Sequence, residues 1–271
     1  MTKATATRTL PPLSAHDLAT RPGEELIRFE GLRKAFGPKV IYTGLDLEIR
    51  RGETLTVIGG SGTGKSVLLK CLIGLLRPDA GSIVFDGQEL VGLSEDEFIP
   101  VRRKIAMLFQ GAALFDSLTV GENVAYPIRE HFPKVSEAEI ADRVAAKLEM
   151  VGLPGIEHMR PSDLSGGMKK RVGLARAIAI DPEVVLYDEP TTGLDPINTR
   201  RINELIVKLN QELRVTSIVV THDMESAYMV SHRMAMLYNH RILARGTVEE
   251  MRRSDVPEVR NFVRGMVGGE A

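Results

Sequence analysis

The chain contains the glycine-rich run Gly59-Gly60-Ser61-Gly62-Thr63-Gly64-Lys65-Ser66, which matches the pattern G-x-x-x-x-G-K-S/T. The glycines allow backbone N–H groups to curl around a phosphate without Cβ clashes. In such a loop, Lys65 would reach the β- and γ-phosphates of a nucleotide, and the Ser66 hydroxyl would ligate Mg²⁺. The alternative is a glycine-rich turn that carries Lys-Ser by chance.

A second candidate is a pair of acids at the end of an apolar run, in Val184-Val185-Leu186-Tyr187-Asp188-Glu189. Charge is costly inside a sheet, so the acids are expected at the carboxyl end of a strand, the same end from which a phosphate loop emerges. Asp188 would hold Mg²⁺ through water, and Glu189 would orient and polarise an attacking water. Taken alone, two such acids could equally begin a loop or cap a helix.

The elements needed to position these groups can be predicted from periodicity. Short apolar or β-branched runs indicate strands at 54–58, 105–109, 184–187, 217–221 and 234–237. Helical patterns at 66–76 and 196–213 lie between them, and this alternation predicts a mainly parallel α/β sheet. The runs at 25–32 and 40–49 alternate apolar and polar residues, which favours an antiparallel piece beside that sheet.

The middle of the chain changes character. Residues 136–152 carry apolar side chains at helical spacing, and a further helix is predicted at about 165–180. We interpret residues 111–180 as a helical insert within the α/β core.

Composition limits the class of protein. The chain has 271 residues and a formal net charge of −1, so it lacks the overall basic field of a nucleic-acid-binding protein, and no nucleic-acid partner is expected. Its one cysteine, Cys71, excludes an intramolecular disulfide and a Cys-rich metal site, and fits a reducing cytoplasm. No apolar run approaches the ~18 residues that a membrane helix needs, so work at a membrane would require a partner.

A third motif, Leu164-Ser165-Gly166-Gly167-Met168, resembles the LSGGQ signature of the ABC ATPases, with Met in the last place. Ser-Gly-Gly alone is more often a flexible loop. Here the run lies between the phosphate loop and the carboxylate strand, and it precedes a predicted helix whose N-terminus could bind an anion. The position of the run therefore supports the resemblance.

The same resemblance extends to other segments and implies roles for them. Phe36 resembles the aromatic residue that stacks on adenine, although it could be an ordinary core residue. Gln110 resembles the glutamine that senses the γ-phosphate and links to the permease, and it is a candidate Mg²⁺ ligand, the alternative being a solvated side chain. Gly193-Leu194-Asp195 resembles the loop that crosses the dimer interface, and His222 resembles the histidine that contacts the γ-phosphate.

The resemblance spans about residues 27–246 and implies a P-loop NTPase fold of the ABC type that binds ATP and Mg²⁺. In this family two subunits pair head to tail, and each ATP lies between the phosphate loop of one subunit and the signature of the other. Ser165, Gly166 and Gly167 would therefore act across the interface, with Asp195 beside them. Lys65, Gln110, Glu189 and His222 form the implied catalytic set.

The local sequence around two segments indicates one branch of the family. The runs 107–115 and 123–131, together with the Met168 ending, resemble the ATPases of MCE/Mla lipid transport systems. That branch implies an integral membrane permease, an MCE-type lipid-binding protein, a phospholipid or other hydrophobic cargo, and a location on the cytoplasmic face of the inner membrane. One segment differs from the sequence of the Mla members: Pro190-Thr191-Thr192-Gly193-Leu194-Asp195. This difference leaves the subfamily and the cargo open.

On this basis we expect a flexible tail at 1–24, the ATPase domain at 25–250 and a helical tail at 251–271. The part of that tail beyond Asn261 resembles a segment of the same branch that can aid dimer pairing. The first residues lack the apolar core of a secretory signal. The competing interpretations are an ABC transporter for another cargo, a soluble ABC ATPase without a permease, and a regulatory subunit that binds ATP with little turnover. The presence of Glu189 and His222 argues against the last of these.

Overall fold

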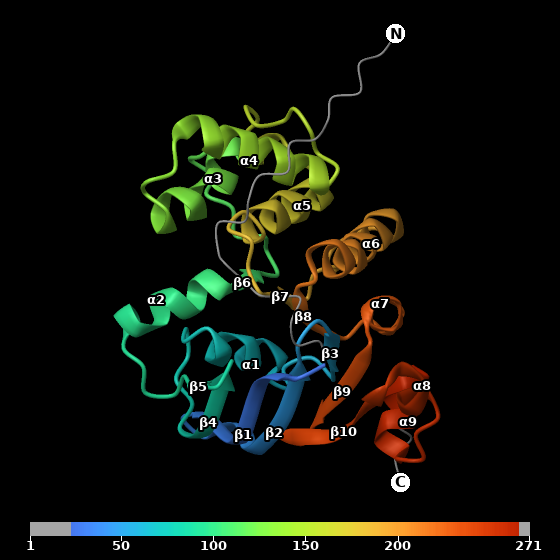
Figure 1. Ribbon diagram of the computed structural model, residues 1–271. Coiled ribbons are helices and arrows are strands. Elements are labelled where there is room, and N and C mark those ends of the chain that lie inside the picture. The colour runs from blue at the N-terminus through green and yellow to red at the C-terminus, as the bar shows by residue number, and fades with distance from the viewer. Residues whose placement is uncertain (1–22, 266–271) are drawn as a thin grey trace.

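The computed structural model describes residues 23–265, so nearly all of the predicted tail at 1–24 and the end of the predicted tail at 251–271 lie outside the described residues. Two sheets organise the chain (Figure 1). The first is antiparallel, has the strand order β2-β1-β4-β5, and confirms the predicted antiparallel piece. Its strands are β1 (Glu25–Phe36), β2 (Lys39–Arg50), β4 (Ala80–Phe85) and β5 (Gln88–Glu89).

Strands β1 and β2 are longer than the alternation of apolar residues indicated. Their pairing continues past residue 32, with Lys34 opposite the buried Tyr42 and Phe36 opposite Lys39. Backbone hydrogen bonds across the hairpin carry the ladder to the turn at Gly37, whose φ of 56° favours glycine. The extension places Phe36 at the tip of the hairpin.

The second sheet has the order β10-β9-β3-β8-β7-β6, and all its pairs are parallel except β9 with β10, which confirms the mainly parallel core. Strands β3, β7 and β8 are buried along their whole length, as strands covered on both faces should be. Its strands are β3 (Thr54–Ile58), β6 (Ile105–Leu108), β7 (Val184–Asp188), β8 (Thr216–Thr221), β9 (Arg233–Tyr238) and β10 (Arg241–Thr247).

Three helices from the middle of the chain gather at one end of the molecule, away from the antiparallel sheet (Figure 1). They are α3 (Val120–His131), α4 (Glu137–Met150) and α5 (Gly166–Ala177), with the 3₁₀ turn η1 (Pro161–Asp163) before α5. Thr119, Ser136 and Ser165 cap their N-termini, each accepting a backbone N–H in its first turn. This group occupies most of the region predicted as a helical insert.

The remaining helices flank the sheets. They are α1 (Lys65–Leu72), α2 (Glu95–Lys104), α6 (Pro196–Leu213), α7 (Met224–Val230), α8 (Val248–Arg252) and α9 (Pro257–Val263). Helix α1 ends earlier than predicted because Gly74, with φ of 71°, turns the chain after Ile73. Within residues 23–265, no helix is both long and apolar enough to cross a membrane.

The parallel strands bring the candidate residues to one edge of the sheet. The phosphate loop follows β3, Gln110 follows β6, Glu189 follows β7 and His222 follows β8. Because parallel strands share their carboxyl edge, residues far apart in the sequence meet there.

Candidate functional site

The phosphate loop is shaped by two glycines with no room for a side chain. A Cβ on Gly59 would lie 2.5 Å from the carbonyl oxygen of Leu237, and a Cβ on Gly64 would lie 2.5 Å from Cγ2 of Ile41. Gly64 also has φ of 110° and begins α1, and its carbonyl oxygen accepts a 2.5 Å hydrogen bond from the buried Tyr42 hydroxyl. The loop is therefore fixed by packing against β2 and β9.

We expect Gly64→Ala to lower the free energy of unfolding by about 1–3 kcal/mol, because the added methyl group overlaps Ile41 in a backbone conformation that alanine disfavours. Urea unfolding followed by circular dichroism measures the change. Gly60→Ala is the matched control, since its Cβ would only come within 3.7 Å of Thr63. Equal stability of Gly64→Ala and the unsubstituted chain would contradict this packing.

Lys65 places a buried ammonium on the floor of the loop. Its Nζ donates hydrogen bonds to the carbonyl oxygens of Gly59 (2.9 Å) and Gly60 (3.0 Å) and lies 3.7 Å from Oε1 of Glu189. Burial lowers the pKa of Lys65, and the Glu189 carboxylate opposes that shift. The Lys65 ammonium, on the floor of the loop, lies where the phosphates of a nucleotide would bind.

The oxygen donors needed for Mg²⁺ lie together. The Ser66 hydroxyl donates a 2.5 Å hydrogen bond to Oδ1 of Asp188, and burial raises the pKa of Asp188. A hydroxyl and a carboxylate beside a phosphate loop fit Mg²⁺, which takes a few protein oxygens and completes its octahedron with phosphates and water. The described residues contain no group of three or more His, Cys, Asp or Glu side chains that could hold a metal ion by themselves.

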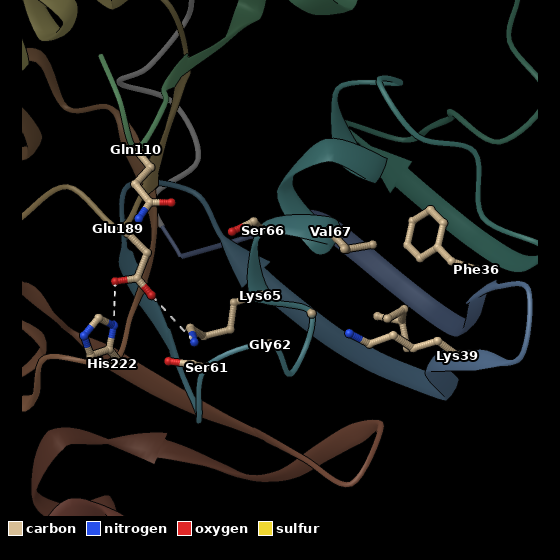
Figure 2. A pocket seen from close by; sticks show the side chains of 12 residues that line it. Phe36, Lys39, Ser61, Gly62, Lys65, Ser66, Val67, Gln110, Glu189 and His222 are labelled. Atoms are coloured by element: carbon tan, nitrogen blue, oxygen red, sulfur yellow. Dashed lines mark ion pairs between the residues drawn. The ribbon is translucent and has the colours of Figure 1, made fainter. Parts of the chain in front are cut away.

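Glu189 lies at the centre of the polar groups. Its Oε2 is 2.9 Å from Nδ1 of His222 and accepts a 3.1 Å hydrogen bond from the Thr192 hydroxyl. The Glu189 side chain is 12% exposed and the His222 side chain 51% exposed, so the histidine lies at the open rim of the site. Figure 2 shows Glu189 between His222 and Lys65.

A pocket of about 420 Å³ joins these groups to the tip of the first hairpin. Gln110, Glu189, His222 and the loop line one side of it, and Phe36, a residue that is 44% exposed, lies on the other side (Figure 2). Lys34 places its Nζ 5.1 Å from the Phe36 ring centroid. An exposed ring across from a phosphate loop is suited to stack on a base.

The signature residues do not lie in this pocket. Ser165 and Gly166 are exposed at the start of α5, and Gly167 is buried against Asn198 of α6. Asp195 caps α6, where it accepts a 3.0 Å hydrogen bond from the Asn198 backbone N–H. Within this chain, Ser165, Gly166 and Asp195 are therefore exposed outside the pocket at the phosphate loop, while Gly167 is buried.

Several lining or supporting residues were not predicted from the sequence. Lys39 and Val67 line the pocket, Tyr42 supports Gly64, and Lys170 donates to the backbone of Glu189. For Lys39 and Val67 the proximity to Phe36 and Ser66 was an available signal. For Tyr42 and Lys170 nothing local distinguishes the residue, because their roles depend on contacts made by tertiary folding.

A separate apolar groove of about 510 Å³ lies against β6 and α3. It brings together the two segments whose sequences resemble the lipid-transport branch. Met107, Phe109 and Phe115 come from 107–115, and Tyr126 and His131 come from 123–131. The Phe115 and Tyr126 rings are 4.9 Å apart and both are partly exposed. Such a surface is suited to receive an amphipathic helix.

Comparison with known proteins gives consistent matches. A model of the family described as "ABC transporter" matches residues 42–192. The probable ribonucleotide transport ATP-binding protein mkl of Mycobacterium leprae (strain TN) is 44% identical over 239 residues, which cover 88% of this chain and 69% of that protein. The chain thus spans about two thirds of the length of that relative.

Two further matches cover nearly the whole length of the other protein. The intermembrane phospholipid transport system ATP-binding protein MlaF of Haemophilus influenzae is 42% identical over 246 residues, which cover 91% of this chain and 93% of that one. A dimeric, post-hydrolysis structure of the ATP-binding cassette MJ0796 with ADP and Pi superposes with a TM-score of 0.76 at 32% identity, covering 82% of this chain and 99% of that one.

Proposed function

This chain belongs to the ABC transporter family as an ATP-hydrolysing subunit, and on that premise we propose that its pocket binds ATP with Mg²⁺ and that closure on a second copy drives a membrane permease. The observation that carries the proposal is the placement of Glu189 between Lys65 and His222 at the mouth of the phosphate loop.

The chain's own groups divide the work of hydrolysis. The loop N–H groups and the Lys65 ammonium bind phosphate oxygens, and Phe36 stacks on the base. The Glu189 carboxylate accepts a hydrogen bond from the attacking water and orients it toward the γ-phosphate, while His222 and Gln110 contact that phosphate from the rim. The Thr192 hydroxyl, 3.1 Å from Oε2 of Glu189, helps to hold the carboxylate in place.

The metal would be held by the Ser66 hydroxyl, with Asp188 acting through water and Gln110 beside them. When bound, Mg²⁺ neutralises charge that develops on the phosphates. The short contact between Ser66 and Asp188 supports this assignment, because it gathers hard oxygen donors beside the loop.

A head-to-tail homodimer would complete each site. Ser165, Gly166 and Gly167 of one subunit would cover the ATP held by the other, with Asp195 lying near the interface. Two observations support this arrangement. Ser165 and Gly166 are exposed away from their own pocket, and the MJ0796 cassette forms a dimer.

For the cargo we favour phospholipid, moved with an MCE-type lipid-binding protein and a permease at the cytoplasmic face of the inner membrane. The relative named for ribonucleotide transport matches over 69% of its length, whereas the MlaF relative, named for phospholipid transport, matches over 93%. The apolar groove at Phe115 and Tyr126 supplies a surface for a helix of the permease.

Affinity purification of the tagged chain from native membranes, with mass spectrometry of bound proteins and lipids, tests the partner assignment. We expect a multi-span permease, an MCE-type protein and phospholipid. A Phe115→Asp, Tyr126→Asp double variant should lose the permease while retaining ATP binding. Recovery of an unrelated permease would discard the lipid assignment, and recovery of no membrane protein would favour a soluble ABC ATPase.

The base contact can be tested separately. We expect Phe36→Ala to raise the KM for ATP by roughly 5- to 100-fold with a small change in kcat, because stacking on a base is worth about 1–3 kcal/mol and is made in the ground state as well. Steady-state phosphate release measures both constants, and Phe36→Trp should preserve binding. An unchanged KM in Phe36→Ala would assign Phe36 to packing instead.

A further inference from the structure

Lys170 is a buried lysine for which the proposed chemistry gives no direct task. It lies in α5, its side chain is 5% exposed, and its Nζ donates a 3.2 Å hydrogen bond to the backbone carbonyl oxygen of Glu189. Lysine is rarely buried to this extent unless it is paired. Burial lowers the pKa of Lys170, while the carboxylates of Asp188 and Glu189 oppose that shift.

The backbone at Glu189 is held in an uncommon conformation. Its φ is 48°, in the left-handed region that a glutamate seldom adopts. The Glu189 N–H donates to the carbonyl oxygen of Val220 (2.9 Å), and the Glu189 carbonyl oxygen accepts from both the Thr192 N–H (3.3 Å) and Lys170. Hydrogen bonds therefore hold both the backbone N–H and the backbone C=O of Glu189. The fixed backbone in turn sets the direction of the Glu189 carboxylate.

The helix that carries Lys170 is also the helix that begins with the signature. Gly167 and Lys170 are three residues apart, so they share one face of α5, and both are buried. Gly167 packs so closely on Asn198 that a Cβ would lie 2.7 Å from Asn198 Cγ. One face of α5 therefore contacts both the start of α6 and the backbone of Glu189.

We propose that Lys170 is a positioning residue for hydrolysis: its ammonium holds the Glu189 backbone in the conformation that aims the carboxylate, and it links that carboxylate to the signature helix. The inference rests on the proposed function. It also gives α5 two tasks, because the signature covers the partner's ATP while Lys170 orients the glutamate of its own site. Through α5, binding of the signature to the partner's ATP is thereby coupled to the orientation of Glu189 in the subunit's own site.

The test compares Lys170→Met, which keeps the length and apolar stem but removes the donor, with the unsubstituted chain. We expect kcat to fall on the order of 10- to 100-fold, the loss associated with a charge-assisted hydrogen bond, while the KM for ATP changes by less than about 3-fold. ATP-induced dimerisation, measured by light scattering, should persist. A defect in packing alone would not separate kcat from KM in this way.

Two further variants control the result. Lys169→Met removes a charge from the adjacent, half-buried position and should keep kcat within about 2-fold. Lys170→Arg keeps a charged donor and should recover most of the kcat that Lys170→Met loses. If Lys170→Met does not fold, Lys170→Gln, which has a weaker and shorter donor, replaces it in the test. Its kcat should also fall while its KM for ATP stays nearly constant.

An unchanged kcat in the folded Lys170→Met or Lys170→Gln variant would overturn the proposal. A raised KM at constant kcat would overturn it as well, because Lys170 would then serve binding. Failure of the proposed function is distinguishable, since the unsubstituted chain itself would then show no hydrolysis.

Discussion

Replacing Glu189 with Gln is expected to reduce ATP hydrolysis by about 10²- to 10⁴-fold while ATP affinity stays within a few-fold. The amide keeps the size of the side chain and can still contact Thr192 and His222, which lie 3.1 Å and 2.9 Å from Oε2. It cannot serve as the carboxylate that orients and deprotonates water. Phosphate release gives the rate, and fluorescence titration with an ATP analogue gives the affinity.

The matched control is Glu225→Gln, which neutralises an exposed acid in the first turn of α7, three residues after His222. It should hydrolyse ATP at the unsubstituted rate. If Glu189→Gln kept that rate too, Glu189 would not be the residue that orients the water, and the assignment of the site would be wrong.

Replacing Lys65 with Ala is expected to weaken ATP binding by roughly 30-fold or more and to remove measurable hydrolysis. The ammonium is buried, and truncating one member of a buried charge pair costs about 2–5 kcal/mol. Loss of this charge also removes the buried cation that lies 3.7 Å from the Glu189 carboxylate. Isothermal titration calorimetry with ATP and Mg²⁺ measures the change.

Lys134→Ala controls for the loss of one positive charge, since Lys134 is exposed in the loop between α3 and α4. Its ATP affinity should equal that of the unsubstituted chain. Full affinity in a folded Lys65→Ala variant would mean that the phosphates lie elsewhere than at this loop.

The core of the fold was predictable where chemistry and periodicity agree. The buried strand β3 consists of apolar or β-branched residues and leads into the phosphate loop. The buried strand β7 begins with the apolar run Val184-Val185-Leu186 and ends at Asp188, the first acid of the carboxylate pair. The order of these elements along the chain then fixes which residues meet at the carboxyl edge. His222 could be placed for the same reason, since it follows the buried strand β8.

Other features depend on contacts that local sequence does not encode. Helix α2 is polar and contains Pro100, so its apolar pattern is weak, although the Ser94–Glu97 capping box was a usable signal. Strand β10 has no fully buried residue and gains its structure by pairing with β9. The burial of Lys170 follows from the packing of α5, and a lysine two residues after the signature would otherwise be expected in solvent.

A disulfide cross-link between subunits tests the head-to-tail dimer most directly. Ser61→Cys in the phosphate loop and Ser165→Cys in the signature place thiols at two exposed positions, in a chain with Glu189→Gln to retain ATP and Cys71→Ser to remove the native thiol. We expect an oxidised dimer on non-reducing gels that forms with ATP and Mg²⁺ and not without nucleotide. Two results would contradict ATP binding between the loop of one subunit and the signature of its partner. One is equal cross-linking with and without nucleotide, and the other is no cross-linking when ATP is shown to be bound.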